Sequence, residues 1–151
     1  MLRVVLDTNV LVNADRGQGS YGKRLLDLVR QGELTAVTTR AVRRENESLV
    51  RQLVRDPELS TEIDEFLEMS QDVAPGAVDI SLEDDEDLKL LTAAVGGGAK
   101  FLVTDDRHLL DVGDYEGVQV VTPKDFWQWW QKHQDDSGHT WAAWATDIFG
   151  R

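Results

Sequence analysis

The chain has 151 residues and no cysteine, and its 28 acidic and 16 basic side chains give a formal net charge of −12. This length predicts one domain with a substantial core, and the lack of cysteine excludes disulfides and thiolate chemistry. No stretch approaches the roughly 20 apolar residues that cross a bilayer, and the sequence opens directly on an apolar strand pattern. We therefore expect a cytoplasmic protein with no membrane span and no secretory signal.

The charge is unevenly distributed along the chain. Residues 1–60 carry 10 Lys and Arg against 8 Asp and Glu, whereas residues 61–151 carry 6 against 20. An acidic protein repels phosphodiesters unless cations intervene or a local basic patch receives them. Solubility alone explains many of the carboxylates, so the useful question is whether a few of them are placed together by the fold.

The first predicted strand, over residues 2–6, ends in Asp7, Thr8 and Asn9. Its consecutive apolar residues are typical of a strand that is covered on both faces, as in the middle of a parallel sheet. Ligands of open α/β sheets bind at the carboxyl ends of the strands, where Asp7 would stand.

Further strands and helices alternate along the chain, each placed by its apolar periodicity, caps and breakers. The helices are predicted over 21–30, 39–54, 61–70, 83–95 and 123–130, and the strands over 2–6, 34–37, 78–80, 101–104 and 118–121. This alternation predicts an α/β fold, a three-layer α/β/α sandwich with a mainly parallel sheet of about five strands.

The helix over 39–54 combines an apolar stripe with a basic one. Glu45 lies about 60° from the apolar stripe, at the edge of the buried face, although an ordinary ion-paired surface residue would fit the same position. Arg40, Arg44 and Arg51 share another side of the helix. They are either a solvated face or the best candidates for holding a phosphate backbone.

Two further acidic segments stand at the ends of predicted elements. Residues 83–87 are all acidic and open a helix, where one or two carboxylates would satisfy the helix N-terminus. Five in a row repel one another unless a cation or strong solvation offsets the cost. The strand over 101–104 ends in Asp105 and Asp106, one of which could cap a short helical turn. The carboxyl ends of parallel strands share one edge, so these groups and Asp7 are predicted neighbours.

Several catalytic motifs are absent from the sequence. There is no phosphate-binding loop ending in Gly-Lys-Ser/Thr, no dinucleotide fingerprint and no nucleophile elbow, and the three histidines lack a zinc-site spacing. Carboxylate oxygens without His or Cys suit Mg²⁺ or Mn²⁺. Such ions promote phosphodiester hydrolysis and reverse the local field at the point where the substrate enters.

In this order and spacing, the acidic motifs resemble the PIN domain, and most closely the bacterial PIN proteins that act as toxins of toxin-antitoxin pairs. The motifs are Asp7-Thr8-Asn9, Glu45, the helix start at 84–91 and the strand end at 102–106. The resemblance spans residues 2 to about 130. It implies a Mg²⁺- or Mn²⁺-dependent endoribonuclease with an RNA substrate, an antitoxin partner and a homodimeric assembly.

The resemblance also implies roles for particular side chains. The four acidic positions that would hold the metal and carry catalysis are Asp7, Glu45, Asp87 and Asp106. The supporting polar positions are Asn9, Thr104 and Asp84, and Asp105 is the alternative to Asp106. Whether Asp84 or Asp87 is the main ligand stays open, because the family often has proline where Asp85 stands.

The sequence predicts a nuclease domain over residues 1–130 and a tryptophan-rich extension over 131–151. The extension would pack on its own domain or dock on a second subunit or a partner. Two other functions remain open. One is a metal-dependent phosphohydrolase of small molecules, although Asn9 stands where phosphatases built on an Asp nucleophile need a second Asp. The other is a non-catalytic acidic module that binds a basic partner.

Overall fold

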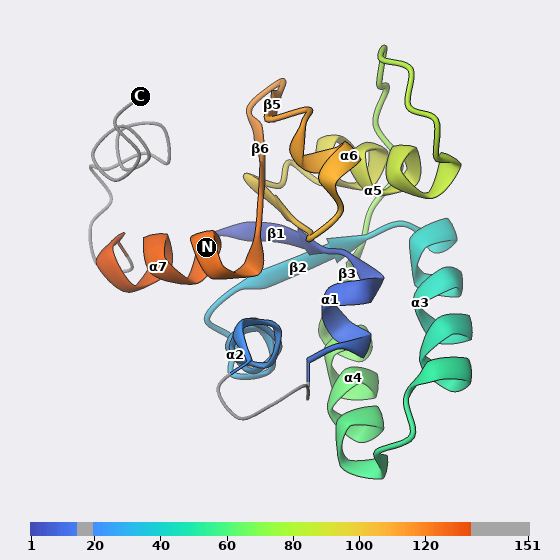
Figure 1. Ribbon diagram of the computed structural model, residues 1–151, viewed down its shortest axis with the longest axis vertical. Coiled ribbons are helices and arrows are strands. Elements are labelled where there is room, and N and C mark those ends of the chain that lie inside the picture. Colours follow the sequence, from blue (N-terminus) through green and yellow to red (C-terminus); the bar gives the residue numbers. More distant parts are fainter. Residues whose placement is uncertain (15–19, 134–151) are drawn as a thin grey trace.

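The computed structural model describes residues 1–14 and 20–133, which form a sheet flanked by helices (Figure 1). The sheet has six strands in the order β3-β2-β1-β4-β6-β5, and all neighbours are parallel except β5 and β6. The strands are β1 (Arg3–Leu6), β2 (Thr35–Thr38), β3 (Gln71–Asp72), β4 (Phe101–Val103), β5 (Asp114–Tyr115) and β6 (Val118–Val121). The predicted α/β class and mainly parallel sheet are confirmed.

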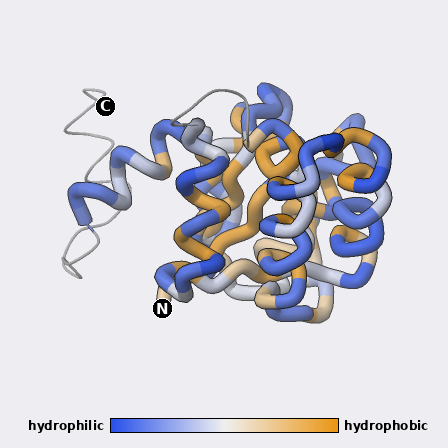
Figure 2. Tube along the Cα trace, turned by 90° about the horizontal axis from the view of Figure 1, so that it is seen from below, coloured by the Kyte–Doolittle hydropathy of each residue, from blue (hydrophilic) through white to orange (hydrophobic). Residues whose placement is uncertain are grey.

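Helices cover both faces of this sheet, and each face has its own apolar cluster. On one face lie α1 (Thr8–Val12), α2 (Tyr21–Arg30), α4 (Pro57–Met69) and α7 (Pro123–His133), and on the other lie α5 (Asp85–Gly96) and α6 (Arg107–Leu110). The remaining helix, α3 (Arg40–Leu53), contributes Val50 to the first cluster and Val42 to the second. Hydrophobic segments accordingly run through the middle of the chain trace in Figure 2.

Strand β1 shows how the sequence produces these two clusters. Val4 and Leu6 belong to the cluster under α2, α4 and α7, whereas Val5 belongs to the cluster under α5. Successive strand residues point to opposite faces, so a continuous apolar run is required wherever both faces are covered. Because β1 pairs with β2 and β4, the residue that follows it lies at the centre of the sheet edge.

The strand predicted over Val78–Ile80 is wrong. Val78 and Ile80 pack against the α5 side of the core, but the backbone hydrogen bonds around them go to other partners. The Gly76 amide donates to the Thr92 carbonyl at 2.8 Å, and the Asp79 amide donates to the Tyr115 hydroxyl at 2.7 Å. The segment therefore lies outside the sheet, bonded to α5 and to Tyr115.

Other element boundaries also differ from the prediction. The helix expected from Thr61 already begins at Pro57, since Asp56 caps it and proline fits a first helical position. The expected five strands become six through the short strands β3 and β5, and the residues directly after Asp7, for which no helix was predicted, form α1. Within residues 1–14 and 20–133, no helix is long and apolar enough to cross a membrane.

Candidate functional site

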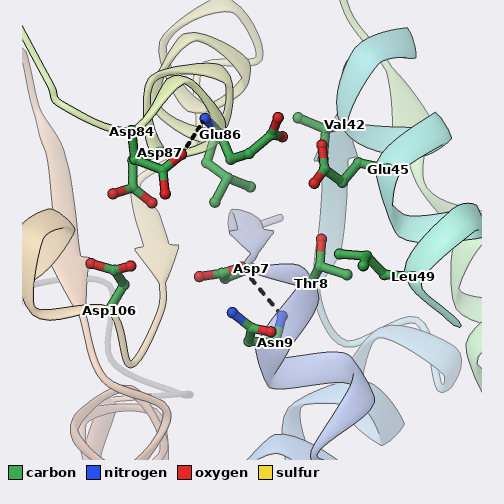
Figure 3. Close-up of a pocket in the computed structure, with 11 residues that line it drawn as sticks. Asp7, Thr8, Asn9, Val42, Glu45, Leu49, Asp84, Glu86, Asp87 and Asp106 are labelled. Carbon is green, nitrogen blue, oxygen red and sulfur yellow. Dashed lines mark hydrogen bonds between the residues drawn. The ribbon is translucent and has the colours of Figure 1, made fainter. Parts of the chain in front are cut away.

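A pocket of about 170 Å³ lies at the carboxyl edge of the sheet, and six acidic side chains line it. They come from the end of β1, from α3, from the start of α5 and from the turn before α6 (Figure 3). The six are Asp7, Glu45, Asp84, Glu86, Asp87 and Asp106. This is the edge where parallel strands stop and loops converge, as expected for a ligand site in an open α/β sheet.

Asp7 is held by hydrogen bonds to both of its carboxylate oxygens. Its Oδ1 accepts from the Asn9 amide at 3.3 Å, which makes Asp7 the N-cap of α1, and its Oδ2 accepts from the Thr104 hydroxyl at 2.7 Å. Thr104 Oγ1 in turn accepts from the Asp106 amide at 2.9 Å. Thr104 is fully buried, so one hydroxyl joins the ends of β1 and β4 beneath the pocket.

The aspartates that surround Asp7 disfavour one another's charge. Burial raises the pKa of Asp7, and the nearby Asp106 and Asp105 raise it further, against the hydrogen bonds from Thr104 and Asn9. Burial raises the pKa of Asp87 to about 6, with added repulsion from Asp106, Asp84 and Asp7. The ionised forms would be favoured by a positive charge in the pocket.

Glu45 and Glu86 lie across the pocket from these aspartates, on α3 and α5 (Figure 3). A hydrogen bond between the two carboxyl groups raises the pKa of Glu45 to about 7 and lowers that of Glu86. Lys89 also lowers the pKa of Glu86 through a 3.0 Å ion pair. The pocket thus has an aspartate side and a glutamate side.

The donor set fits a hard divalent cation. The lining offers carboxylate oxygens without thiolate or imidazole, and in the described part of the chain Asp7, Asp84, Asp87 and Asp106 form no ion pair. In the same part, no three acidic or His side chains are already arranged as the ligands of one ion. Mg²⁺ keeps several of its waters and needs only one or two carboxylates, so it suits such an open site.

The two aspartates after Thr104 diverge. Asp106 lines the acidic pocket and caps α6, with its Oδ1 accepting from the His108 amide at 2.8 Å. Asp105 lines a different pocket, beside Tyr21 and Lys124. The fold therefore places Asp106 with Asp7 and directs Asp105 to another surface.

The three supporting residues, Asn9, Thr104 and Asp84, line the acidic pocket or contact Asp7 from beneath it. Asn9 lines the pocket and is exposed, and Thr104 lies beneath Asp7. Asp84 lines the pocket while its Oδ1 caps α5 by accepting from the Glu86 amide at 2.8 Å. Of the eight polar residues to which the family resemblance gave roles, only Asp105 lies outside the pocket and its buried support.

Sequence reasoning gave no individual role to Thr8, Asn46 or Glu86. The Thr8 hydroxyl donates to Asn46 Oδ1, and both residues are buried, so this hydrogen bond ties α1 to α3 beside Glu45. Glu86 belonged to the predicted acidic cluster, but its approach to Glu45 depends on how α3 packs beside α5. Only the acidic run hinted at Glu86, and no sequence signal pointed to the buried Thr8–Asn46 pair.

Comparison with known proteins agrees with this geometry. The family model for the PIN domain matches residues 3–108, which include every residue of the acidic pocket. No curated protein matches the chain.

Proposed function

Because the chain belongs to the PIN domain family, whose members are generally metal-dependent nucleases, we propose that it is an endoribonuclease that uses Mg²⁺ or Mn²⁺. The observation that carries the proposal is the set of aspartates from three separate segments that line one pocket at the sheet edge and form no ion pair with any described residue. A structural role alone does not account for collecting them, because burial and repulsion raise the pKa of Asp7 and Asp87.

In this proposal Asp7, Asp87 and Asp106 hold the ion, with Asp84 as a further oxygen donor at the start of α5. A bound divalent ion supplies polarisation of a phosphoryl oxygen and activation of water for attack on phosphorus. Thr104 keeps the Asp7 carboxylate oriented, since its hydroxyl donates a hydrogen bond to one of the two carboxylate oxygens. Asn9 supports Asp7 from the start of α1 and offers an exposed amide to water or substrate.

Glu45 has a separate proposed role, as the group that orients the attacking water. Its carboxyl group stands on the opposite wall of the pocket and its pKa is about 7, close to the pH at which a general base works best. Glu86 holds that carboxyl group through their shared hydrogen bond, and Lys89 holds Glu86 through the ion pair.

Cleavage of a mixed RNA pool tests the proposal directly. We expect the purified protein to shorten the RNA with Mn²⁺ or Mg²⁺ and to lose this activity when a chelator is added. Asp7→Asn should abolish cleavage without unfolding the chain, because asparagine keeps the size of the side chain and also caps helices well. Full activity of folded Asp7→Asn would overturn the assignment, and activity on phosphomonoesters without RNA cleavage would favour a small-molecule phosphohydrolase.

The likeness to PIN-type toxins supports a narrower proposal, that this nuclease is the toxin of a toxin-antitoxin pair and is neutralised by a protein antitoxin. Induced expression in a bacterial host should then arrest growth, and expression of Asp7→Asn should not. Equal growth with the wild-type protein and with Asp7→Asn, at equal protein levels, would contradict the toxin role. The nuclease proposal would still be tested by the RNA assay.

A further inference from the structure

Helix α3 separates its arginines into two kinds. Arg43 points toward α4 and β3, where its guanidinium donates to the carbonyls of Leu67 at 2.6 Å and Ser70 at 3.0 Å and pairs with Asp72 at 2.9 Å. Arg40, Arg44 and Arg51 are exposed and form no ion pair with any residue that the structure describes. We call these three residues the arginine face.

In the described part of the chain, ten of the fourteen basic side chains form no ion pair, and the arginine face is distinguished by having three of them on one side of one helix. The four described basic side chains that do form an ion pair are Lys23, Arg30, Arg43 and Lys89. The arginine face even lies near acidic groups, because Arg51 borders a groove that Asp64 and Glu68 also line. Its guanidinium nevertheless has no carboxylate within ion-pairing distance among the described residues, and it stays available to a ligand.

The arginine face and the acidic pocket share one helix. Val42, Glu45 and Leu49 of α3 form a wall of the pocket, and Figure 3 shows Glu45 and Leu49 on the side toward Asp7. At 100° per residue, Arg44 lies about 100° around the helix from Glu45, with Arg40 and Arg51 on the same side as Arg44. Arg40 and Arg51 lie about 140° and 120° from Glu45, so the arginine face is on the outer side of α3, with Arg44 its member nearest the pocket wall. Helix α3 itself lies at the edge of the molecule in Figure 1.

The spacing of the arginines suits a polyanion. Arg40 and Arg44 are one helical turn apart, and Arg40 to Arg51 covers roughly 16 Å of helix at 1.5 Å per residue. This length accommodates several consecutive phosphates of one strand. A chain with a charge of −12 also needs a local positive surface if a polyanion is to approach its acidic pocket.

From these observations we propose that the arginine face binds the phosphate backbone of single-stranded RNA on one side of the scissile bond and directs the strand along α3 into the acidic pocket. This inference rests on the proposed nuclease function and adds the path of the substrate. Arg40 and Arg44 are the main contacts, since Arg51 stands beside the carboxylates of Asp64 and Glu68.

The salt dependence of RNA binding tests this path. The measurement uses the full chain carrying Asp7→Asn, so that RNA is not cut, a short fluorescent single-stranded RNA, constant Mg²⁺ and salt from about 50 to about 300 mM. Arg40→Gln/Arg44→Gln should weaken binding about tenfold and reduce the slope of log K against log salt by about 1.4, which is about 0.7 for each lost phosphate contact.

A matched double variant controls for net charge. Lys100 lies next to β4 at the opposite edge of the sheet, and Lys132 is exposed on α7, so Lys100→Gln/Lys132→Gln removes the same charge away from the pocket. It should leave affinity within about twofold and the slope unchanged. Equal slopes of log K against log salt for the two double variants would overturn the proposal. An acidic protein would then be the better candidate to bind the arginine face.

Cleavage by the otherwise wild-type chain separates this inference from the proposed function. RNA binding that depends on the arginine face, with no cleavage by the wild-type protein, would support the path and contradict the nuclease activity. Cleavage with an unchanged kcat/KM in Arg40→Gln/Arg44→Gln would support the nuclease and contradict the path.

Discussion

The Thr104 hydroxyl donates a 2.7 Å hydrogen bond to Asp7 Oδ2 and accepts one of 2.9 Å from the Asp106 amide, although Thr104 and Asp7 are 97 positions apart. One buried oxygen thus orients the carboxylate of Asp7 after β1 and also holds the backbone amide of Asp106 after β4. The geometry of the candidate site depends on this contact because Asp7 forms no ion pair with the described residues.

Thr104→Val should weaken Mn²⁺ binding by about 10- to 100-fold, because it removes the hydrogen bond that orients Asp7 while conserving the volume of the side chain. The loss also removes a group that lowers the pKa of Asp7, so protons compete better with the metal. Titration calorimetry with Mn²⁺ measures the effect. Thr104→Ser keeps the hydroxyl and should bind nearly as tightly as wild type; equal affinities for Val and Ser would show that the hydrogen bond has no such role.

Asp106→Asn should abolish RNA cleavage, and Asp105→Asn should leave most of it. The two residues are neighbours, but only Asp106 lines the acidic pocket. Asparagine still caps α6 in place of Asp106, so the fold should survive. Initial cleavage rates, with melting curves as the check on folding, compare the pair. The opposite ranking would move the metal site to the other pocket.

The pKa shifts predict how pH changes stability without metal. The pKa of Asp87 is raised from 3.8 to about 6 and that of Glu45 from 4.5 to about 7, so between these values the folded state holds more protons than the unfolded state. These groups therefore favour folding at low pH, and their contribution is lost as pH rises through about 4 to 7.

A divalent ion should reverse that loss. Protons compete with the metal for the same carboxylates, so saturating Mn²⁺ should raise Tm more at about pH 8 than at about pH 5. Melting curves with and without Mn²⁺ at the two pH values provide the comparison. A larger Mn²⁺ effect at the lower pH would be incompatible with a carboxylate site.

The hydrogen bond between Thr8 and Asn46 should contribute to stability. Thr8→Val keeps the shape but leaves Asn46 Oδ1 buried without its donor, which should lower the free energy of unfolding by about 1 to 3 kcal/mol. Urea denaturation measures this change. Thr61→Val is the matched control, because Thr61 is exposed and its hydroxyl donates to the Pro57 carbonyl of the same helix; an equal loss there would contradict a special role for the buried pair.

Much of the sheet could be predicted from sequence, because strands covered on both faces need long apolar runs. The placement of Asp7 and Asp106 follows from the same rule, since parallel strands end at one edge. The choice between Asp105 and Asp106 depends on which of them caps α6. The strand pattern does not determine this, because a shift of one residue in the start of α6 would exchange the two.

Other features depend on tertiary packing that leaves no local signal. Val78 and Ile80 have the apolar pattern of a strand, but that pattern also suits an irregular segment that packs on the α5 side of the core. The contact between Glu45 and Glu86 requires α3 and α5 to lie side by side, which helical periodicity in either segment does not reveal.

The most direct measurement is the anomalous diffraction of Mn²⁺ in crystals of the protein grown or soaked with the ion. The account predicts one strong peak between the carboxylates of Asp7, Asp87 and Asp106, which would move closer together around it, and no such peak in Asp7→Asn. A pocket that holds only water at saturating Mn²⁺, with folded protein and intact side chains, would contradict it.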